Sequence, residues 1–237
     1  MTESRHCPST SRSPIFLVVP TRNEEASIAA ALADVPHQIV DLVIVADGAS
    51  TDSTVSMARA VGATVIDAGH GYGRACWLGA LAAEPDAILV YMDGDGSDCA
   101  ALIPTLVEPI RAGRADFVMA SRVLGKRERG SIGLHQILAG RIAGALINLL
   151  YGVSYSDMCA FRAIRRKTLL GLGMREMTYG WNLEMQMRAA QARLRVLEIA
   201  VPYRKRLGGH SKVSGNFMAS IRVGLRLVST FIRLAVE

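Results

Sequence analysis

The chain has 237 residues, of which 50% are hydrophobic and 20% are charged. This length suits one large α/β domain with a well-buried core and is too short for two comfortable ones, and the composition excludes a disordered chain. The net charge of +6 and the isoelectric point of about 9.4 favour anionic partners, which include nucleic acid, nucleotide phosphates and an acidic membrane surface.

Strands and helices alternate through the first half of the sequence. Short β-rich apolar runs predict strands at residues 15–19, 42–46, 63–66, 87–92 and 116–120, the first of them stopped by Pro20. Helices are expected at 24–33 with Asn23 as the cap, after Ser50-Thr51-Asp52, after the Gly-rich turn 69–73, and at 100–112. This alternation predicts β-α-β units and a largely parallel sheet, whose ligands would lie beyond the carboxyl ends of the strands.

The regular alternation of strands and helices ends after Arg122. A basic loop at 125–133 precedes a mostly apolar helix at 134–150, and the remaining elements are helices at 166–172 and 181–192, a strand at 195–201 and a basic segment at 203–212. No internal repeat is visible. We therefore expect a disordered head at 1–13, one domain at 14–215 and a C-terminal amphipathic helix at 216–237.

The cysteines and the apolar runs indicate where in the cell the protein is located. Cys7, Cys76, Cys99 and Cys159 are scattered, without a C-x-x-C pair or clustered histidines, which argues against a zinc site and favours reduced thiols in a cytosolic protein. No apolar run reaches the roughly 18 residues of a spanning helix, and the polar head lacks the apolar stretch of a signal peptide. We expect a cytoplasmic protein that is able to lie on a membrane.

The strongest chemical signal is Asp93-x-Asp95, at the end of the fourth strand. Two carboxylates one residue apart, on a turn made tight by Gly94 and Gly96, can present oxygens to one hard cation. Mg²⁺ or Mn²⁺ held there would bridge a diphosphate and offset charge on a leaving nucleotide. The alternative is a plain acidic turn after a strand, which is common.

Polar residues also follow the first two strands. Asp47 ends the second strand and can accept hydrogen bonds from the base or ribose of a nucleotide, whereas Asp52 is better placed to cap its helix. Residues 20–25, PTRNEE, form a polar loop after the first strand, which could equally be an ordinary helix start. Together with Asp93 and Asp95, these residues favour a nucleotide site at one edge of the sheet.

Two basic segments have competing explanations. In 204–212, cations alternate with two glycines, which predicts a mobile loop that closes over a diphosphate, although a solvated charge run is the alternative. In the tail, Arg222, Arg226, Ser229 and Arg233 fall on one helical face and Phe217, Val223, Leu227, Phe231 and Leu234 on the other. Such a helix either lies on an anionic membrane or packs on its own domain, and the sequence leaves both open.

Several segments, taken in order, resemble the inverting family 2 of glycosyltransferases. They are VVPTRNEE (18–25), VIVADGASTDST (43–54), GYGRACWLGAL (71–81), YMDGDGSD (91–98), ASR (120–122), LLYGVSYSDMCAFRAIRR (149–166), YGWNLEMQ (179–186) and VPYRKRLGGHSKVSG (201–215). The match runs nearly end to end, and the most similar subgroup includes the dolichyl- and polyprenyl-phosphate sugar synthases. The resemblance implies a GT-A fold, with a mostly parallel central sheet flanked by helices.

The resemblance also implies roles for individual residues. Residues 14–122 would bind the nucleotide sugar and 123–215 the acceptor. The nucleotide-sugar residues would be Pro20, Asn23, Glu24, Asp47, Gly73, Asp93, Arg122, His210, Ser211 and Lys212. Asp93 and Asp95 would hold the metal, and the acceptor side would include Arg122, Phe161 and Arg162. The catalytic set would be Asp95, Asp157, Glu184 and Arg206.

Two positions depart from the family pattern. Asp47-Gly48-Ala49 stands where many members have Asp-Asp-Gly or Asp-Asn-Gly, so base contacts beyond Asp47 are in doubt. Arg74 stands where many members carry a small residue after Gly-Tyr-Gly; it could bind phosphate or be a solvated charge at a helix start.

The implied reaction is inverting transfer from a uridine- or guanosine-diphosphate sugar, with the charge on the leaving diphosphate stabilised by the metal and by Arg122, Arg206 and Lys212. The acceptor would be a polyprenyl phosphate, which needs no general base, or a hydroxyl, for which Asp157 and Glu184 are the candidate bases. Peripheral membrane contact and a homodimer are both compatible with the sequence.

Other classes are disfavoured on specific grounds. A non-catalytic nucleotide-sugar-binding protein would not need the intact Asp93/Asp95 pair. A dinucleotide dehydrogenase would carry G-x-G-x-x-G after the first strand, where this chain has PTRNEE. Nucleic-acid binding fits the net charge, but no aromatic platform or helix-turn-helix signal accompanies it.

Overall fold

The computed structural model of the protein describes residues 12–208 and 217–237. Its centre is a seven-stranded sheet with the order β3-β2-β1-β4-β6-β5-β7. The strands are β1 (Ile15–Thr21), β2 (Leu42–Asp47), β3 (Thr64–Asp67), β4 (Ile88–Tyr91), β5 (Phe117–Ser121), β6 (Arg162–Arg165) and β7 (Val196–Ala200). All pairs are parallel except those of β6, which runs antiparallel between β4 and β5. The α/β class and the mostly parallel sheet are therefore confirmed.

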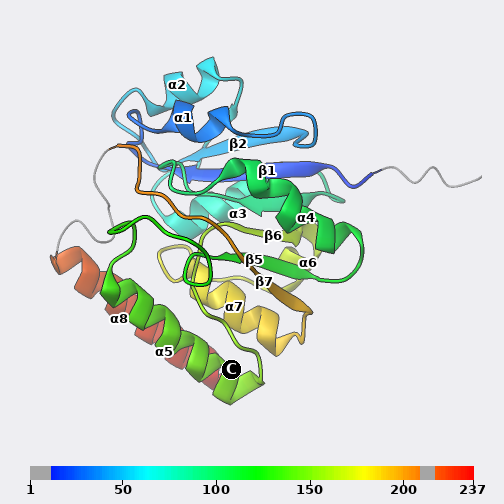
Figure 1. Cartoon of the computed structure of the whole chain (residues 1–237), viewed down its shortest axis with the longest axis vertical. Coiled ribbons are helices and arrows are strands. Elements are labelled where there is room, and N and C mark those ends of the chain that lie inside the picture. Colours follow the sequence, from blue (N-terminus) through cyan, green and yellow to red (C-terminus); the bar gives the residue numbers. More distant parts are fainter. Residues whose placement is uncertain (1–11, 209–216) are drawn as a thin grey trace, which may run out of the picture.

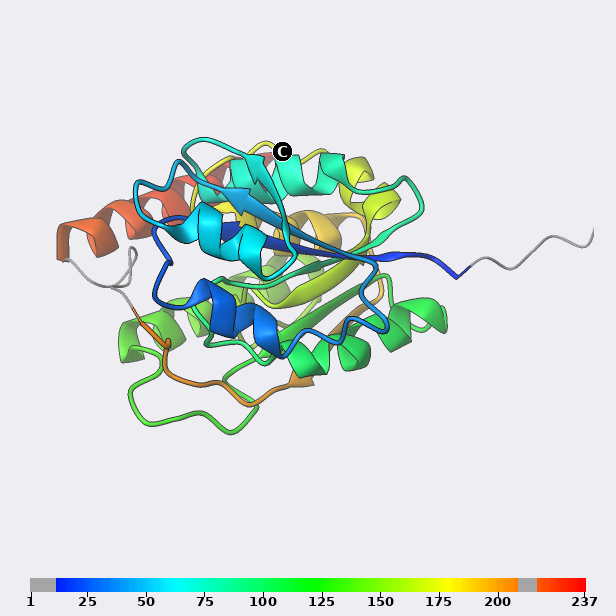
Figure 2. The same cartoon turned by 90° about the horizontal axis from the view of Figure 1, so that it is seen from above.

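Helices cover both faces of this sheet (Figures 1 and 2). One face packs against α1 (Ile28–Ala33), α2 (Thr54–Ala60) and α4 (Ile103–Arg111), which follows the 3₁₀ turn Ala100–Leu102. The other face packs against α3 (Tyr72–Ala82), α6 (Arg166–Gly171) and α7 (Trp181–Gln191). Beyond α7, at one outer edge of the molecule, lie α5 (Leu134–Tyr151) and α8 (Phe217–Val236) (Figure 1).

The first strand shows why the central segments fold as strands. Every residue of β1 is buried, with Ile15, Leu17 and Val19 in the core on one face and Phe16 and Val18 in the core on the other. A strand covered by helices on both faces needs such a continuous apolar run. The same pattern at β2 and β4 made these strands predictable from sequence.

Two expectations about the first loop are wrong. β1 continues through Pro20 to Thr21, because the pairing with β4 ends at Val18 and the missing Pro20 N–H lies beyond it. Asn23 does not cap a helix at 24–33: α1 begins at Ile28, and Asn23 has a φ of 50°. The Asn23 side chain instead accepts a hydrogen bond from Thr51 N (2.8 Å), which ties together the loops after β1 and β2.

The antiparallel strand β6 was missed. Its four residues, RAIR, contain two arginines, so no apolar run marks them, although Arg162 is fully buried. The remaining predicted helices and strands are confirmed to within a few residues at their ends.

The C-terminal helix packs one of its sides on its own domain, which is one of the two alternatives left by the sequence. Leu234 is buried, Leu227 and Phe231 pack against the core on the α7 side, and Arg226 and Arg233 pair with Glu176 and Glu184. No helix in the described part of the chain has both the length and the apolarity to span a bilayer.

Candidate active site

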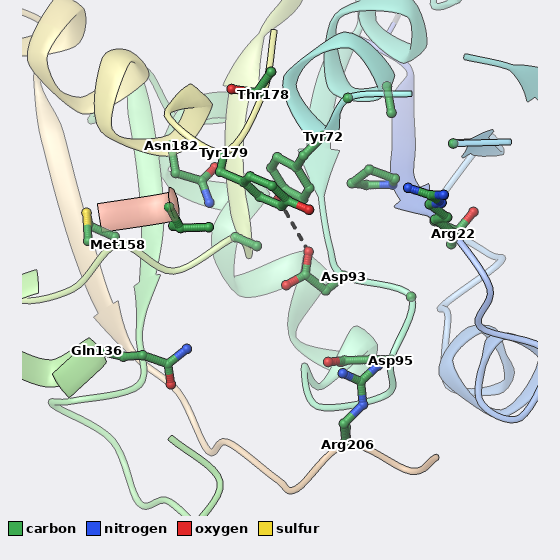
Figure 3. A pocket seen from close by; sticks show the side chains of 18 of the residues that line it. Arg22, Tyr72, Asp93, Asp95, Gln136, Met158, Thr178, Tyr179, Asn182 and Arg206 are labelled. Atoms are coloured by element: carbon green, nitrogen blue, oxygen red, sulfur yellow. Dashed lines mark hydrogen bonds between the residues drawn. The ribbon is translucent and has the colours of Figure 1, made fainter. Parts of the chain in front are cut away.

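A cavity of about 660 Å³ lies beyond the carboxyl ends of β1 and β4, which is the edge predicted to bind ligand (Figure 3). This volume is in the range of small-molecule sites. Six residues of the predicted site line it: Pro20, Glu24, Asp93, Asp95, Arg122 and Arg206. The cavity therefore gathers predicted residues from Pro20 to Arg206, which lie far apart in the sequence.

Asp93 and Asp95 project into the cavity from the turn after β4 (Figure 3). The Tyr72 hydroxyl donates a hydrogen bond to Asp93 Oδ1 (3.3 Å). Asp95 Oδ1 accepts from the Ser97 backbone N–H (3.0 Å) and from the Ser97 hydroxyl, which holds the turn in shape. A third carboxylate, Asp98, lies behind them and accepts from the Asp93 N–H (3.2 Å).

The close spacing of these buried carboxylates raises their pKa values. Burial, and then the charge of Asp95, raises the pKa of Asp93 to about 7. Burial, Asp93 and Asp95 likewise raise the pKa of Asp98 well above its ordinary value. Asp98 Oδ1 is a buried oxygen without a hydrogen bond in the described structure. Close carboxylates with an unsatisfied oxygen are stabilised by either a proton or a cation.

The donor set suits a hard divalent cation shared with a ligand. The described residues contain no group of three or more His, Cys, Asp or Glu arranged to hold a metal ion. Mg²⁺ and Mn²⁺ take oxygen ligands, and in phosphate-binding sites one or two carboxylates are completed by phosphate oxygens and water. Asp93 and Asp95 fit such a site.

Arg122 and Asp157 form a buried ion pair at the cavity wall. Asp157 Oδ2 accepts from Arg122 Nε (2.7 Å) and from its backbone N–H (3.0 Å), and Oδ1 accepts from Nη2 (2.7 Å). Burial alone would raise the pKa of Asp157, but the hydrogen bonds and charge of Arg122 lower it overall. Arg122 also lies over the Tyr203 ring (5.1 Å), and its Nη1 is not used by the pair. Asp157 itself does not line the cavity.

Arg206 enters the cavity from the segment after β7 and points toward Asp95 (Figure 3). Its Nη2 donates to both oxygens of Glu24 (2.9 and 2.8 Å), which fixes a guanidinium beside the two carboxylates. His210, Ser211 and Lys212, the other predicted residues of this segment, lie outside the described residues.

The ends of β1 and β2, where the sequence predicts the nucleoside, lie beside the cavity, although Asp47 itself does not line it. Thr21 and Asp47 are paired in register there, and Gly48, which lines the cavity, donates to Thr21 O (2.7 Å). Asp47 accepts from Ser50 N (3.0 Å) through Oδ2, while its Oδ1 and the Thr21 hydroxyl are buried without a described partner. Asn23 lies just outside the cavity lining.

Toward α5 and α8 the cavity lining becomes more apolar, although the polar Gln136 and Asn182 also lie there (Figure 3). Ala139 from α5, Met158 and Ala160 from the segment before β6, and Val223 and Leu227 from α8 line this part of the cavity. These side chains were not predicted because ordinary apolar residues carry no chemical pattern, although Met158 and Ala160 lie inside a family-like segment. Other cavity residues missed from the predicted set, Tyr72, Tyr179 and Asn182, do lie inside the family-like segments (Figure 3).

Four predicted site residues lie elsewhere. Phe161 is part of the buried core, and Arg162 is buried in β6, where it donates to the carbonyl oxygens of Cys159 and Asn182. Gly73 lies at the start of α3, packed against the backbone of residues 176–177. Glu184 is buried on α7 and does not reach the cavity.

The Glu184 carboxylate is fully engaged in holding neighbouring segments. Its Oε2 accepts from the Arg175 and Glu176 backbone N–H groups (2.9 and 2.5 Å). Its Oε1 accepts from Arg188 (3.0 Å) and from Arg233 of α8 (3.2 Å). Through these bonds Glu184 holds α8 against the domain.

The fold and the cavity define a class: an α/β enzyme with a nucleotide-type site at the strand ends and acidic and basic groups facing one cavity. A model of the family described as glycosyl transferase family 2 matches residues 16–172. An uncharacterised glycosyltransferase of Mycobacterium tuberculosis is 37% identical over 212 residues, which cover 87% of this chain and 93% of the relative. The undecaprenyl-phosphate mannosyltransferase of Micrococcus luteus is 29% identical over 229 residues, which cover 89% of this chain and 92% of the relative.

Among solved structures, glucosyl-3-phosphoglycerate synthase from Mycobacterium tuberculosis, in complex with Mn²⁺, uridine diphosphate and glucosyl-3-phosphoglycerate, shares the fold with a TM-score of 0.74. It is 21% identical, and the match covers 94% of this chain and 80% of that one. The chain belongs to glycosyltransferase family 2 and has the GT-A fold.

Proposed function

We propose that this glycosyltransferase moves a hexose from a uridine- or guanosine-diphosphate sugar to a polyprenyl phosphate, with inversion and with Mg²⁺ or Mn²⁺ at Asp93 and Asp95. The Micrococcus relative is named for an undecaprenyl-phosphate acceptor, and the Mycobacterium structure holds Mn²⁺ and uridine diphosphate. Both fit the carboxylates and cations of this cavity. The free thiols of Cys76, Cys99 and Cys159 suit the predicted location at the cytoplasmic face of a membrane.

The observation that carries the proposal is the two-ended character of the cavity. Charged groups, including Asp93, Asp95 and Arg206, line one end, and at the other end apolar side chains of α5 and α8 lie around the uncharged Gln136. A polyprenyl phosphate has the same division, with an anionic head and a hydrocarbon tail. A small polar acceptor would leave the apolar end without a function.

The acid–base groups favour a phosphate acceptor over a hydroxyl. A hydroxyl must lose a proton as it attacks, whereas a phosphate oxygen is already anionic. Both carboxylates that the sequence offered as bases are engaged by arginines: Asp157 by Arg122, and Glu184 by Arg188 and Arg233. An ionised Asp157 with a lowered pKa is a poor proton acceptor.

In the proposed reaction, a phosphate oxygen of the acceptor attacks the anomeric carbon from the face opposite the nucleotide. The bond from that carbon to the diphosphate breaks, and its electron pair leaves with the nucleoside diphosphate. A bound Mg²⁺ or Mn²⁺ supplies positive charge beside the diphosphate. Arg206 and the free Nη1 of Arg122 would bind and orient the two anionic groups.

Transfer assays with matched carboxylate variants test this function. The wild-type chain is incubated with nucleoside-diphosphate sugars, Mn²⁺ and a short, water-soluble polyprenyl phosphate, and the sugar–lipid product is measured by mass spectrometry. Asp95→Asn keeps an oxygen for the Ser97 bonds but removes the charge, so we expect the rate to fall on the order of 100-fold or more. Asp86→Asn, an exposed aspartate in the turn before β4, should leave it unchanged.

Three results would contradict the proposal. Product formation that is unchanged in Asp95→Asn would remove the metal assignment. Transfer to a hydroxyl compound such as phosphoglycerate, without transfer to polyprenyl phosphate, would establish the alternative acceptor class. Tight nucleotide-sugar binding without turnover on any acceptor would indicate a non-catalytic binding protein.

A further inference from the structure

The helix α5 is apolar on nearly its whole circumference, yet only part of it is covered. Its sequence, LHQILAGRIAGALINLLY, contains a single Arg and no Asp, Glu or Lys. Gly140, Gly144 and Ile147 face the protein. The other side exposes large apolar residues: Leu134, Leu138, Ile142, Leu146, Leu149 and Leu150. A helix of this composition is normally buried all round or placed in a membrane.

The buried side of α5 fixes this orientation. A side chain at Gly144 would place its first carbon 1.9 Å from the Tyr155 carbonyl oxygen, so the helix backbone lies directly on the segment before β6. Tyr151, at its end, donates to Leu234 O of α8 (3.3 Å). The exposed leucines therefore cannot turn inward without breaking this packing.

The helix α8 exposes a second apolar stripe, made of Leu225, Val228, Ile232 and Val236. Its inner side is fixed by the buried carboxylate of Glu176, which accepts from Arg226 (2.9 Å) and Thr230 (3.0 Å). The sequence placed the arginines on one face of this helix without deciding which face is outward. Two of them, Arg226 and Arg233, bind the domain, so the outward side carries the apolar stripe, with Arg222 exposed beside it.

The two exposed stripes are together called the α5–α8 face. The helices that carry them lie at the outer edge of the molecule (Figure 1), and they meet near their last turns, where Tyr151 contacts Leu234. The cavity reaches these helices: Ala139 of α5 and Val223 and Leu227 of α8 line it, together with the polar Gln136. A hydrocarbon chain whose phosphate lies at Arg122 would thus leave the cavity between two helices that expose leucines.

Charges beside this face are mostly basic, with the exposed Glu128 as an acidic exception. Arg141 of α5 and Arg222 of α8 are exposed, and Lys126, Arg127 and Arg129 are exposed on the loop that leads into α5. Long basic side chains at the rim of an apolar surface can reach lipid phosphates while the apolar residues enter the acyl region. A second copy of the chain would instead bring like charges together.

We infer that the α5–α8 face docks on the surface of an anionic lipid bilayer, with both helices in the interfacial plane. The docked face would place the apolar mouth of the cavity at the membrane, so that a lipid-phosphate head enters while its chain stays in the bilayer. The inference that this face binds a membrane is drawn from its exposed side chains alone. The inference that the acceptor enters the cavity from the membrane also rests on the proposed function.

Vesicle binding with matched variants tests the docking. The variant Leu138→Glu/Leu149→Glu/Ile232→Glu changes residues that are 60%, 80% and 58% exposed and that do not line the cavity. The control, Val61→Glu/Leu81→Glu, changes residues that are 40% and 43% exposed, on the ends of α2 and α3. Sedimentation is measured with phosphatidylglycerol vesicles and with phosphatidylcholine vesicles, at low and high salt.

We expect the wild type and the control to bind phosphatidylglycerol vesicles, more weakly in high salt and on phosphatidylcholine. The triple variant should lose at least about tenfold in partition coefficient. It should keep wild-type transfer to a short, water-soluble polyprenyl phosphate and lose transfer to a long-chain acceptor embedded in vesicles. If the wild type binds vesicles but transfers to neither acceptor, the docking stands and the proposed function fails.

Two outcomes would overturn the inference. One is equal vesicle binding by the triple variant and the wild type, or no binding by either. The other is a dimer in light scattering that the triple variant dissociates, without vesicle binding, which would assign the face to a second copy of the chain.

Discussion

Asp93 is subject to two opposing requirements. Its place in the cavity puts a carboxylate where a cation can bind, but burial and the nearby Asp95 disfavour its charge and raise its pKa to about 7. Without metal, the folded protein therefore holds a proton there that the unfolded chain, with an ordinary aspartate pKa of 3.8, has released. Stability from this group is present at low pH and is lost as pH rises toward neutrality.

Asp93→Asn should consequently stabilise the metal-free protein and abolish transfer. At about pH 8 we expect a gain on the order of 1 kcal/mol, or a few degrees in Tm, because the neutral amide replaces a destabilised charge. At about pH 5 the gain should be smaller, since only part of the destabilisation that develops between the unfolded pKa of 3.8 and the folded pKa of about 7 is then present. Thermal unfolding in EDTA at both pH values measures this. An equal gain in stability at both pH values would contradict a pKa of Asp93 that is raised by burial and by Asp95.

Asp157 is a positioning residue for Arg122 in this structure. An amide at position 157 would face one of the Arg122 donors with another donor, so Asp157→Asn should loosen the guanidinium. We expect the KM for the acceptor to rise about tenfold, with the pH dependence of kcat unchanged in shape. The control is Asp116→Asn, which breaks a similar but exposed pair with Arg195.

The pH profile separates this role from general-base catalysis. The pKa of Asp157 lies below its ordinary value of 3.8, so its charge is constant across the neutral range. Loss of a titrating limb from the profile of Asp157→Asn would show that Asp157 accepts a proton and would favour a hydroxyl acceptor.

At the scale of single residues, the sequence predicts which kinds of residue line the site better than it predicts what each residue does there. Asp93, Asp95 and Arg206 were identified from motif and position, and they line the cavity. Glu184 belongs to an equally family-like segment, but its carboxylate is bound by Arg188 and Arg233. The partner Arg233 is 49 residues away, on a helix whose packing the sequence did not decide.

At the scale of elements, the start of α3 shows how tightly the site is built. Gly73 N–H donates to Thr178 O (3.2 Å), and a side chain at Gly73 would place its first carbon 2.4 Å from Glu176 O. The neighbouring Tyr72, which holds Asp93, is thus fixed against the loop before α7.

Gly73→Ala should therefore destabilise the protein by about 1–3 kcal/mol and lower transfer, because the overlap with backbone displaces α3. Gly171→Ala at the end of α6, where no heavy atom lies within 4 Å, is the matched control and should be nearly neutral. Urea unfolding of both variants provides the measurement. Equal stability of the two would show that the approach of α3 to residues 176–178 is not tight.

Among the elements, those with clear periodicity were predictable and those held by tertiary contacts were not. The apolar runs of β1, β2 and β4 identified the buried strands. The strand β6 carries arginines and is recognisable only from its antiparallel pairing with β4 and β5. The outward face of α8 depended on where Glu176 lies, which no local pattern shows.

At the scale of the whole molecule, the cavity joins the two predicted halves of the chain. The first half supplies Asp93, Asp95 and Glu24, the second supplies Arg206 and apolar residues of α5, and the C-terminal helix α8 adds further apolar residues. The ordered motifs were enough to predict the fold, the family and the charged end. They could not predict the apolar end, because it forms only when α5 and α8 approach each other across the cavity.

The acceptor phosphate is the most direct test of the proposed function. Transfer is measured with two acceptors that have the same prenyl chain, one a polyprenyl phosphate and the other the corresponding polyprenol. With no base positioned by Asp157 or Glu184, we expect product from the phosphate and none from the alcohol. Equal transfer to the alcohol, or transfer to the alcohol alone, would contradict the phosphate as the attacking group.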